Sequence, residues 1–90
     1  MTMETLLPNF FMRGVTMEKL LALLSDIRPD VDFANETKLI DDGLLDSLNI
    51  MEIVMEICEE FDVELSPADI IPANFNSAKS MYEMIQRLKA

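Results

Sequence analysis

The chain has 90 residues, half of them apolar, which is enough for one small folded domain but leaves little room for an enzyme's cleft. Its formal net charge is −10, so nucleic acid is a poor partner, because phosphate binding requires a basic surface. A basic protein is a better partner for such a charge, since long-range attraction speeds encounter. The sequence contains no His, which removes the usual general base and the commonest metal ligand. The single Cys cannot form an internal disulfide and fits a reducing, cytoplasmic compartment.

The first sixteen residues differ from the rest of the chain. They combine a Pro, a Gly and a cluster of apolar residues without sustained helical periodicity. A secretory signal peptide would need a basic start, and the first charge here is Glu4. No stretch reaches the roughly 18 apolar residues of a membrane helix, so membrane insertion is not expected. We therefore interpret residues 1–16 as an N-terminal extension and residues 17–90 as the domain.

From residue 16 onward the apolar residues follow helical spacing. A first helix begins after Thr16, a good N-cap, and ends at Arg28-Pro29, because the residue before a Pro disfavours the α conformation. Residues 29–46 form a long connection, and a loop of that length in so small a domain tends to be functional. We expect its apolar side chains to pack against the helices. These side chains are Phe33, Leu39, Ile40, Leu44 and Leu45.

Three further helices are predicted after this loop. The second helix starts at Ser47 and ends at about Phe61. The run Ser66-Pro67-Ala68-Asp69 predicts a short capped helix, which Pro72 ends. Either Asn76 or Ser77 caps the last helix. The apolar stripe of that helix is Met81, Met84, Ile85 and Leu88. The expected fold is an all-α bundle of three longer helices and one short helix, with a long first loop.

The second helix carries two apolar faces when its residues are placed about 100° apart around the axis. The first face is an ordinary core stripe of Ile50, Ile53, Val54, Ile57 and Phe61. The second face, here called the Leu/Met row, consists of Leu48, Met51, Met55 and Cys58. Residues 30–69 contain thirteen acidic residues against Lys38 alone, so the row lies on a strongly acidic helix. Such a row favours docking of partner proteins, with packing against the core or the extension as the alternative.

The sequence Asp46-Ser47-Leu48 stands at the start of this helix, and Ser47 is expected to be its N-cap residue. Since the chain has no His, Ser47 cannot be the nucleophile of a Ser-His catalytic system. It can instead be modified by another enzyme. A phosphodiester on its hydroxyl would lie at a helix N-terminus, where free N–H groups favour an anion.

The run Gly43-Leu44-Leu45-Asp46-Ser47-Leu48, followed by an acidic amphipathic helix, resembles the phosphopantetheine-binding segment of acyl carrier proteins. The resemblance extends over residues 17–88. It implies that Ser47 is the attachment site of 4′-phosphopantetheine, donated by coenzyme A, with Asp46 and Leu48 as its motif partners. It also implies that partner enzymes contact the second helix. The residues expected at this docking surface are Met51, Glu52, Met55 and Glu59.

Within this family, the sequence Gly-Leu-Leu-Asp-Ser is similar to that of D-alanyl carrier proteins, which are small freestanding carriers loaded by an adenylating ligase. Fatty-acid carriers usually have Gly and a small residue directly before Asp-Ser, whereas Gly43 here stands further back. The cargo stays open among D-alanine, another amino acid, and a fatty or polyketide acyl group. The bulky Leu residues of the loop favour a small cargo.

The resemblance implies a carrier protein rather than an enzyme. Its expected partners are a phosphopantetheinyl transferase, an acyl- or aminoacyl-activating ligase and downstream acyl-transfer enzymes. No metal site is expected, because aligning Gly43 with an EF-hand loop puts Lys38 and Ile40 where oxygen ligands belong. Cys58 is interpreted as a packing residue, since no basic group adjoins it in sequence. The alternative function is an acidic helical adaptor that binds a basic partner and carries no prosthetic group.

Overall fold

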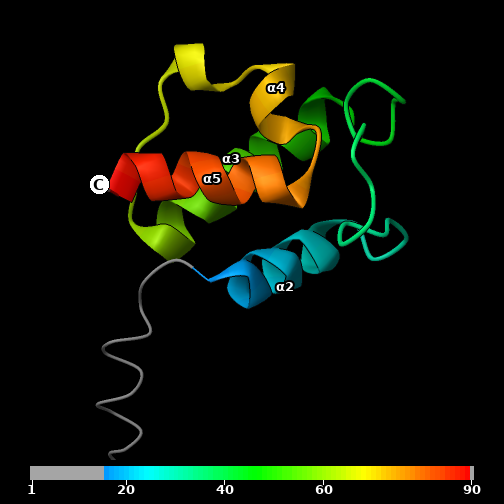
Figure 1. The fold of residues 1–90 in the computed structure, drawn as a ribbon, viewed down its shortest axis with the longest axis horizontal. Coiled ribbons are helices and arrows are strands. Elements are labelled where there is room, and N and C mark those ends of the chain that lie inside the picture. The colour runs from blue at the N-terminus through cyan, green and yellow to red at the C-terminus, as the bar shows by residue number, and fades with distance from the viewer. Residues whose placement is uncertain (1–15, 90) are drawn as a thin grey trace, which may run out of the picture.

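The computed structural model describes residues 16–89, which form helices and loops but no β-strand (Figure 1). The predicted N-terminal extension lies outside the described residues apart from Thr16. The helices are α2 (Met17–Ile27), α3 (Ser47–Phe61), α4 (Pro72–Phe75) and α5 (Ala78–Lys89), and a 3₁₀ turn, η1 (Pro67–Asp69), precedes α4. The predicted all-α fold of three longer helices and one short one is confirmed. None of the helices within residues 16–89 has the length and apolarity that a bilayer crossing requires.

The helix α2 begins and ends where the sequence predicts. The hydroxyl oxygen of Thr16 accepts a hydrogen bond from the N–H of Lys19 at 3.2 Å, which satisfies one of the free donors of the first turn. At the other end, the N–H of Arg28 donates to the carbonyl of Leu24 at 2.9 Å, and Pro29 follows directly. The helix therefore ends at Ile27, with Arg28 as its C-cap, because Pro29 disfavours the α conformation of Arg28.

The segment between α3 and α5 differs from the prediction in one respect. The N–H of Ser66 donates to a carboxylate oxygen of Asp69 at 2.9 Å, so η1 is capped as predicted. The prediction that Pro72 ends this short helix is wrong, because Pro72 begins α4. The first residue of a helix needs no N–H partner, and the fixed φ of Pro suits that position. Ser77, rather than Asn76, caps α5, since its hydroxyl accepts from the N–H three residues further on at 3.0 Å.

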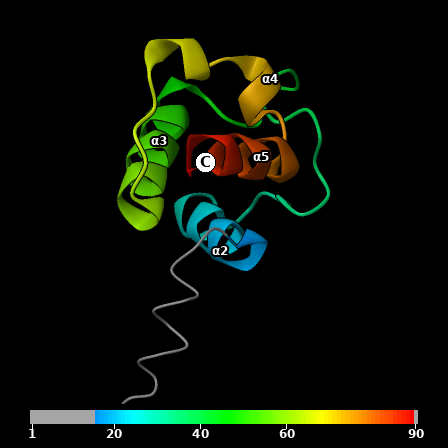
Figure 2. The ribbon, with the colours of Figure 1, turned by 60° about the vertical axis from the view of Figure 1, so that its left-hand side comes forward.

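The helices surround one apolar core. In Figure 2, α5 lies in the middle with α3, α2 and α4 around it, and α2 packs against both α3 and α5. Both apolar stripes predicted from the sequence contribute to this core. Its fully buried members from the two helices are Ile53, Ile57, Phe61, Met81, Met84 and Ile85. Because burying one such side chain contributes about 1.5–3 kcal/mol, this core supplies most of the stability of the bundle.

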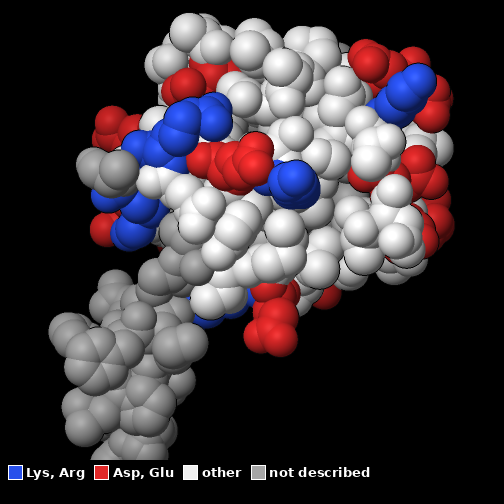
Figure 3. Space-filling model, viewed as in Figure 1, with Lys and Arg blue, Asp and Glu red and all other residues white. Residues whose placement is uncertain are grey.

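The loop of residues 28–46 is folded against the helices. Phe33, Leu39 and Leu45 are buried, and Ile40 and Leu44 pack against the core while half-buried, which confirms the predicted packing. Figure 3 shows acidic side chains gathered over this loop, whereas Lys and Arg side chains gather over the C-terminal end of α5. The loop thus combines an apolar underside with an acidic outer surface.

Candidate functional site

The residues Asp46, Ser47 and Leu48 lie where the loop meets α3. The carboxylate of Asp46 accepts from the N–H of Asn49 at 2.8 Å, and the side-chain oxygen of Asn49 accepts from the N–H of Asp46 at 3.2 Å. This reciprocal capping box stabilises the first turn by about 1 kcal/mol. The prediction that Ser47 is the N-cap is therefore wrong, since Ser47 is the first residue of the helix. If Ser47 were the cap, the reciprocating position would fall on Ile50, whose side chain cannot accept a hydrogen bond.

The capping role of Asp46 leaves the Ser47 hydroxyl free. Ser47 is exposed, and within residues 16–89 its hydroxyl makes no hydrogen bond to the protein. The N-terminus of a helix carries unsatisfied N–H groups and the positive end of the helix dipole, which together favour an anion. A phosphate esterified to Ser47 would therefore meet a favourable electrostatic environment and no steric obstacle from a capping contact.

A tight turn carries the chain into this helix. The N–H of Gly43 donates to the carbonyl of Ile40 at 3.0 Å, and the N–H groups of Leu44 and Leu45 both donate to the carbonyl of Leu39, at 2.9 and 3.2 Å. Gly43 has a φ of +73°, a left-handed conformation that favours glycine. Apart from Gly43 and its two chain neighbours, no atom lies within 4 Å of the position that a Cβ would take there, so the requirement for glycine comes from the backbone conformation alone.

Asn76, which lies between α4 and α5, fastens the same loop from the far end of the chain. Its side-chain oxygen accepts from the N–H groups of Ile40 and Asp41 at 2.9 and 3.1 Å, and its carbonyl accepts from the N–H of Leu39 at 2.9 Å. The sequence suggested Asn76 merely as an alternative cap for α5. A helix needs only one cap, so two adjacent candidates, Asn76 and Ser77, indicate that one of them has a different hydrogen-bond partner.

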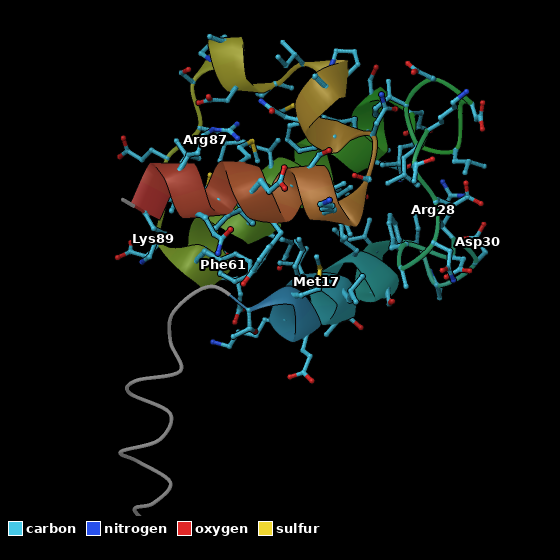
Figure 4. All side chains as sticks on the ribbon, in the orientation of Figure 1. Met17, Arg28, Asp30, Phe61, Arg87 and Lys89 are labelled. Atoms are coloured by element: carbon cyan, nitrogen blue, oxygen red, sulfur yellow. The ribbon has the colours of Figure 1, made fainter. Side chains whose placement is uncertain are left out.

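Arg28 contacts the site from the end of α2. Its Nη1 donates to the carbonyl of Leu44 and to the side-chain oxygen of Asn49, both at 2.9 Å. Its Nε and Nη2 donate to the two carboxylate oxygens of Asp30 at 2.9 and 2.8 Å. Figure 4 shows Arg28 and Asp30 side by side where the chain leaves α2. The sequence alone predicts only that Arg28 stands at the end of the first helix.

The contact with Arg28 is expected to give Asp30 an unusual titration. Hydrogen bonding from Arg28 is the main reason why the pKa of Asp30 is lowered to about 2, with a backbone hydrogen bond as the next cause. A lowered pKa in the folded state adds stability that is present above the ordinary value of about 3.9 and is lost as the pH falls from there through about 2. NMR titration of the Asp30 carboxyl should show the low midpoint, and Arg28→Met should return it to the ordinary range. A wild-type midpoint near 3.9 would contradict the bidentate contact.

The Leu/Met row faces away from the core. Leu48 is 69% exposed, Met51 54% and Met55 62%, whereas Cys58 at the edge of the row is half-buried. Glu52 and Glu59, like the row, lie on the exposed side of α3. The predicted exposure of Met51 and Met55 is confirmed, and their role in docking stays a prediction.

A small apolar pocket opens beside the first turns of α3. Its volume is about 110 Å³, and Ile50, one turn along the helix from Ser47, contributes to it. The complete lining is Ile40, Ile50, Ile70, Ile71, Pro72 and Phe75. Within residues 16–89 no group of three or more acidic or Cys side chains is arranged to hold a metal ion.

Comparison with known proteins gives the family. The family described as "Phosphopantetheine attachment site" matches residues 18–85. The chain is 36% identical over 64 residues to aminoacyl carrier protein 2 of Bradyrhizobium diazoefficiens, covering 71% of this chain and 64% of that relative. It is 36% identical over 56 residues to "Probable acyl carrier protein PigG" of Serratia sp., covering 62% and 64%. It is 34% identical over 53 residues to an acyl carrier protein of Buchnera aphidicola subsp. Baizongia pistaciae, covering 59% and 65%.

The chain thus spans just under two thirds of the length of the curated relatives it matches. No solved structure matches it significantly. Because the family pattern covers most of its residues, the chain belongs to the phosphopantetheine-binding carrier proteins. The family is one of carrier proteins and not of catalysts, and its attachment site implies 4′-phosphopantetheine as the prosthetic group. When bound, that group supplies a terminal thiol that holds an acyl cargo as a thioester.

Proposed function

We propose that the protein is an acyl or aminoacyl carrier whose 4′-phosphopantetheine is attached to Ser47. The observation that carries the proposal is the exposed hydroxyl of Ser47, free of any capping contact at the first position of α3. Of the other four serines in the matched segment, three have hydrogen-bonded hydroxyls, and Ser25 is exposed but lies near the C-terminal end of α2 rather than at a helix N-terminus. The hydroxyl of Ser66 donates to Asp69 at 3.1 Å, and those of Ser77 and Ser80 are bonded to each other at 3.0 Å.

Loading of the wild-type protein tests this proposal. The chain is incubated with coenzyme A, Mg²⁺ and a broad-specificity phosphopantetheinyl transferase, and its intact mass is measured. We expect one phosphopantetheine per chain, which tandem mass spectrometry of the peptides locates on Ser47. If the protein stays unmodified under conditions that convert a control carrier, the adaptor without a prosthetic group becomes the better hypothesis. Modification at another serine would contradict the assignment of the site.

The cargo is proposed to be small, and an amino acid fits best, with D-alanine as one candidate. The similarity to a relative named as an aminoacyl carrier protein supports this choice. The buried Leu39 and Leu45 fill the space beneath the loop, and the pocket of about 110 Å³ beside Ile50 is small. The cargo can be identified by incubating the phosphopantetheine-bearing protein with ATP and an extract of the cells that produce it. A fatty acyl thioester in the resulting mass spectrum would overturn the proposal of a small cargo.

The partners proposed for the carrier are a phosphopantetheinyl transferase, an activating ligase and downstream acyl-transfer enzymes, all in the cytoplasm. We propose that they bind the Leu/Met row of α3 together with the flanking acids Glu52 and Glu59. The exposed apolar side chains would supply contact area, and the acids would attract basic surfaces and speed the encounter.

Substituting Met55 tests the docking surface. Met55→Glu is expected to slow loading by the transferase about tenfold, because a charge must then be desolvated in an apolar contact. Since Met55 is 62% exposed, the free energy of unfolding should change by no more than about 0.5 kcal/mol. The matched control is Gln86→Glu, which adds the same charge at an exposed position of α5 and should load normally. Equal loading rates for the two variants would contradict docking at the row.

A further inference from the structure

The side chain of Arg28 joins two parts of the chain that are far apart in sequence. Arg28 follows the last residue of α2, yet its Nη1 reaches Leu44 and Asn49, which lie 16 and 21 residues further along. One acceptor precedes the Asp46-Ser47-Leu48 motif and the other follows it. Arg28 thus forms hydrogen bonds to the chain on both sides of Ser47 and none to Ser47 itself.

Asp30 fixes the direction in which the Arg28 guanidinium points. The two carboxylate oxygens of Asp30 accept from Nε and Nη2, which occupies one edge of the planar group. Because the guanidinium is rigid, holding that edge aims Nη1 at Leu44 and Asn49. The side chain of Arg28 is 29% exposed, so the arrangement is partly shielded from water.

Asn49 connects Arg28 to the Asp46-Ser47-Leu48 motif by hydrogen bonds. Its side-chain oxygen accepts from Arg28 and also from the N–H of Asp46, while its own N–H donates to the Asp46 carboxylate. The contact with Arg28 therefore holds Asn49 in the rotamer that completes the capping box. Loss of that rotamer would loosen the first turn of α3, where Ser47 lies.

Helix electrostatics does not account for a cation at this place. The N-terminus of a helix carries partial positive charge, so a guanidinium beside it is disfavoured, and the negative charges of Asp30 and Asp46 offset the repulsion. The contact is thus explained by its hydrogen-bond geometry. We propose that Arg28, oriented by Asp30, is a positioning residue that holds the Ser47 hydroxyl in the geometry required for phosphopantetheine transfer. The role in transfer rests on the attachment at Ser47 proposed above.

The experiment compares Arg28→Met with Lys19→Met in the full chain. Lys19 lies at the opposite end of α2 and pairs with Glu60 of α3 at 3.9 Å, so its substitution removes the same charge between the same two helices, away from the motif. With the transferase, Arg28→Met is expected to lower kcat about tenfold with KM within about twofold, because misplacement of a reacting group reduces the rate after binding. Lys19→Met should load at the wild-type rate.

Hydrogen exchange supplies a second readout that needs no transferase. The N–H of Asn49 donates to Asp46, and we expect its exchange to rise about tenfold in Arg28→Met but not in Lys19→Met. Unchanged exchange and unchanged kcat would overturn the proposal, as would a rise in exchange throughout the bundle. If Arg28→Met fails to fold, Asp30→Asn should show the same local changes to a smaller extent, and their absence would overturn it. If the wild-type protein is not loaded at Ser47, the proposed function fails, while the exchange comparison still decides whether Arg28 orders the first turn.

Discussion

Replacing Ser47 with Ala is expected to abolish loading with phosphopantetheine while leaving the fold intact. Loading fails because the variant lacks the hydroxyl that would attack the pyrophosphate of coenzyme A. The fold persists because Asp46, and not Ser47, caps α3, and because Ala is a favourable residue within a helix. Intact-mass measurement after transferase treatment should show unmodified protein, and the free energy of unfolding should lie within about 0.5 kcal/mol of wild type.

The matched control is Ser25→Ala, which removes the hydroxyl of another exposed serine, in α2. This variant should be loaded completely. Loading of Ser47→Ala to the wild-type extent would show that the arm is attached elsewhere. A large loss of stability in Ser47→Ala would show that the hydroxyl has a structural role that the capping geometry does not predict.

The largest loss of stability is expected from truncating the buried face of α3. Ile57 is fully buried, and Ile57→Ala should lower the free energy of unfolding by about 2–5 kcal/mol, since it removes buried methyl groups and leaves a cavity. That is a large share of the stability of a domain this small, which is on the order of 5 kcal/mol. Urea unfolding followed by circular dichroism should show a much lower midpoint with a similar slope.

Met55→Ala is the control for Ile57→Ala, because both truncate an apolar side chain of the same helix. Met55 lies two residues before Ile57 but is 62% exposed, so its truncation should change the free energy of unfolding by no more than about 0.5 kcal/mol. A similar loss in both variants would mean that the Leu/Met row is part of the core. The pair thereby separates the face that holds the bundle together from the face proposed to meet partners.

The helices and the core could be predicted because their signals are local. The stripes of α3 and α5 repeat at helical spacing, and Thr16 and Pro29 mark the ends of α2 within a few residues of sequence. The Leu/Met row could also be predicted, since the helical spacing of α3 places these residues on a second face, apart from the core stripe. Its angular spacing separated it from the core stripe but left packing open as the alternative, and the exposure of Met51 and Met55 decides between the two.

The contacts that hold the site could not be predicted, because they join distant parts of the chain. Arg28 meets Asn49 across 21 residues, and Asn76 meets Ile40 across 36. Such pairs depend on how the elements pack, which no local pattern encodes. The choice of cap failed for a different reason. Asp46 and Ser47 are both good caps, and the deciding partner is the side chain of Asn49, three residues after Asp46.

The cap at Asp46 bears on how the carrier would respond to its own modification. If Ser47 held the helix end, esterifying it would crowd a native contact, because the bulky phosphate would stand at the oxygen that accepts the capping hydrogen bond. With the cap one residue earlier, the hydroxyl makes no capping contact that esterification would disturb, and the helix dipole favours the phosphate, so the loaded form is expected to be at least as stable as the apo form. The arm could then be added or hydrolysed repeatedly without the bundle having to refold. The switch between inactive and active carrier would be purely chemical.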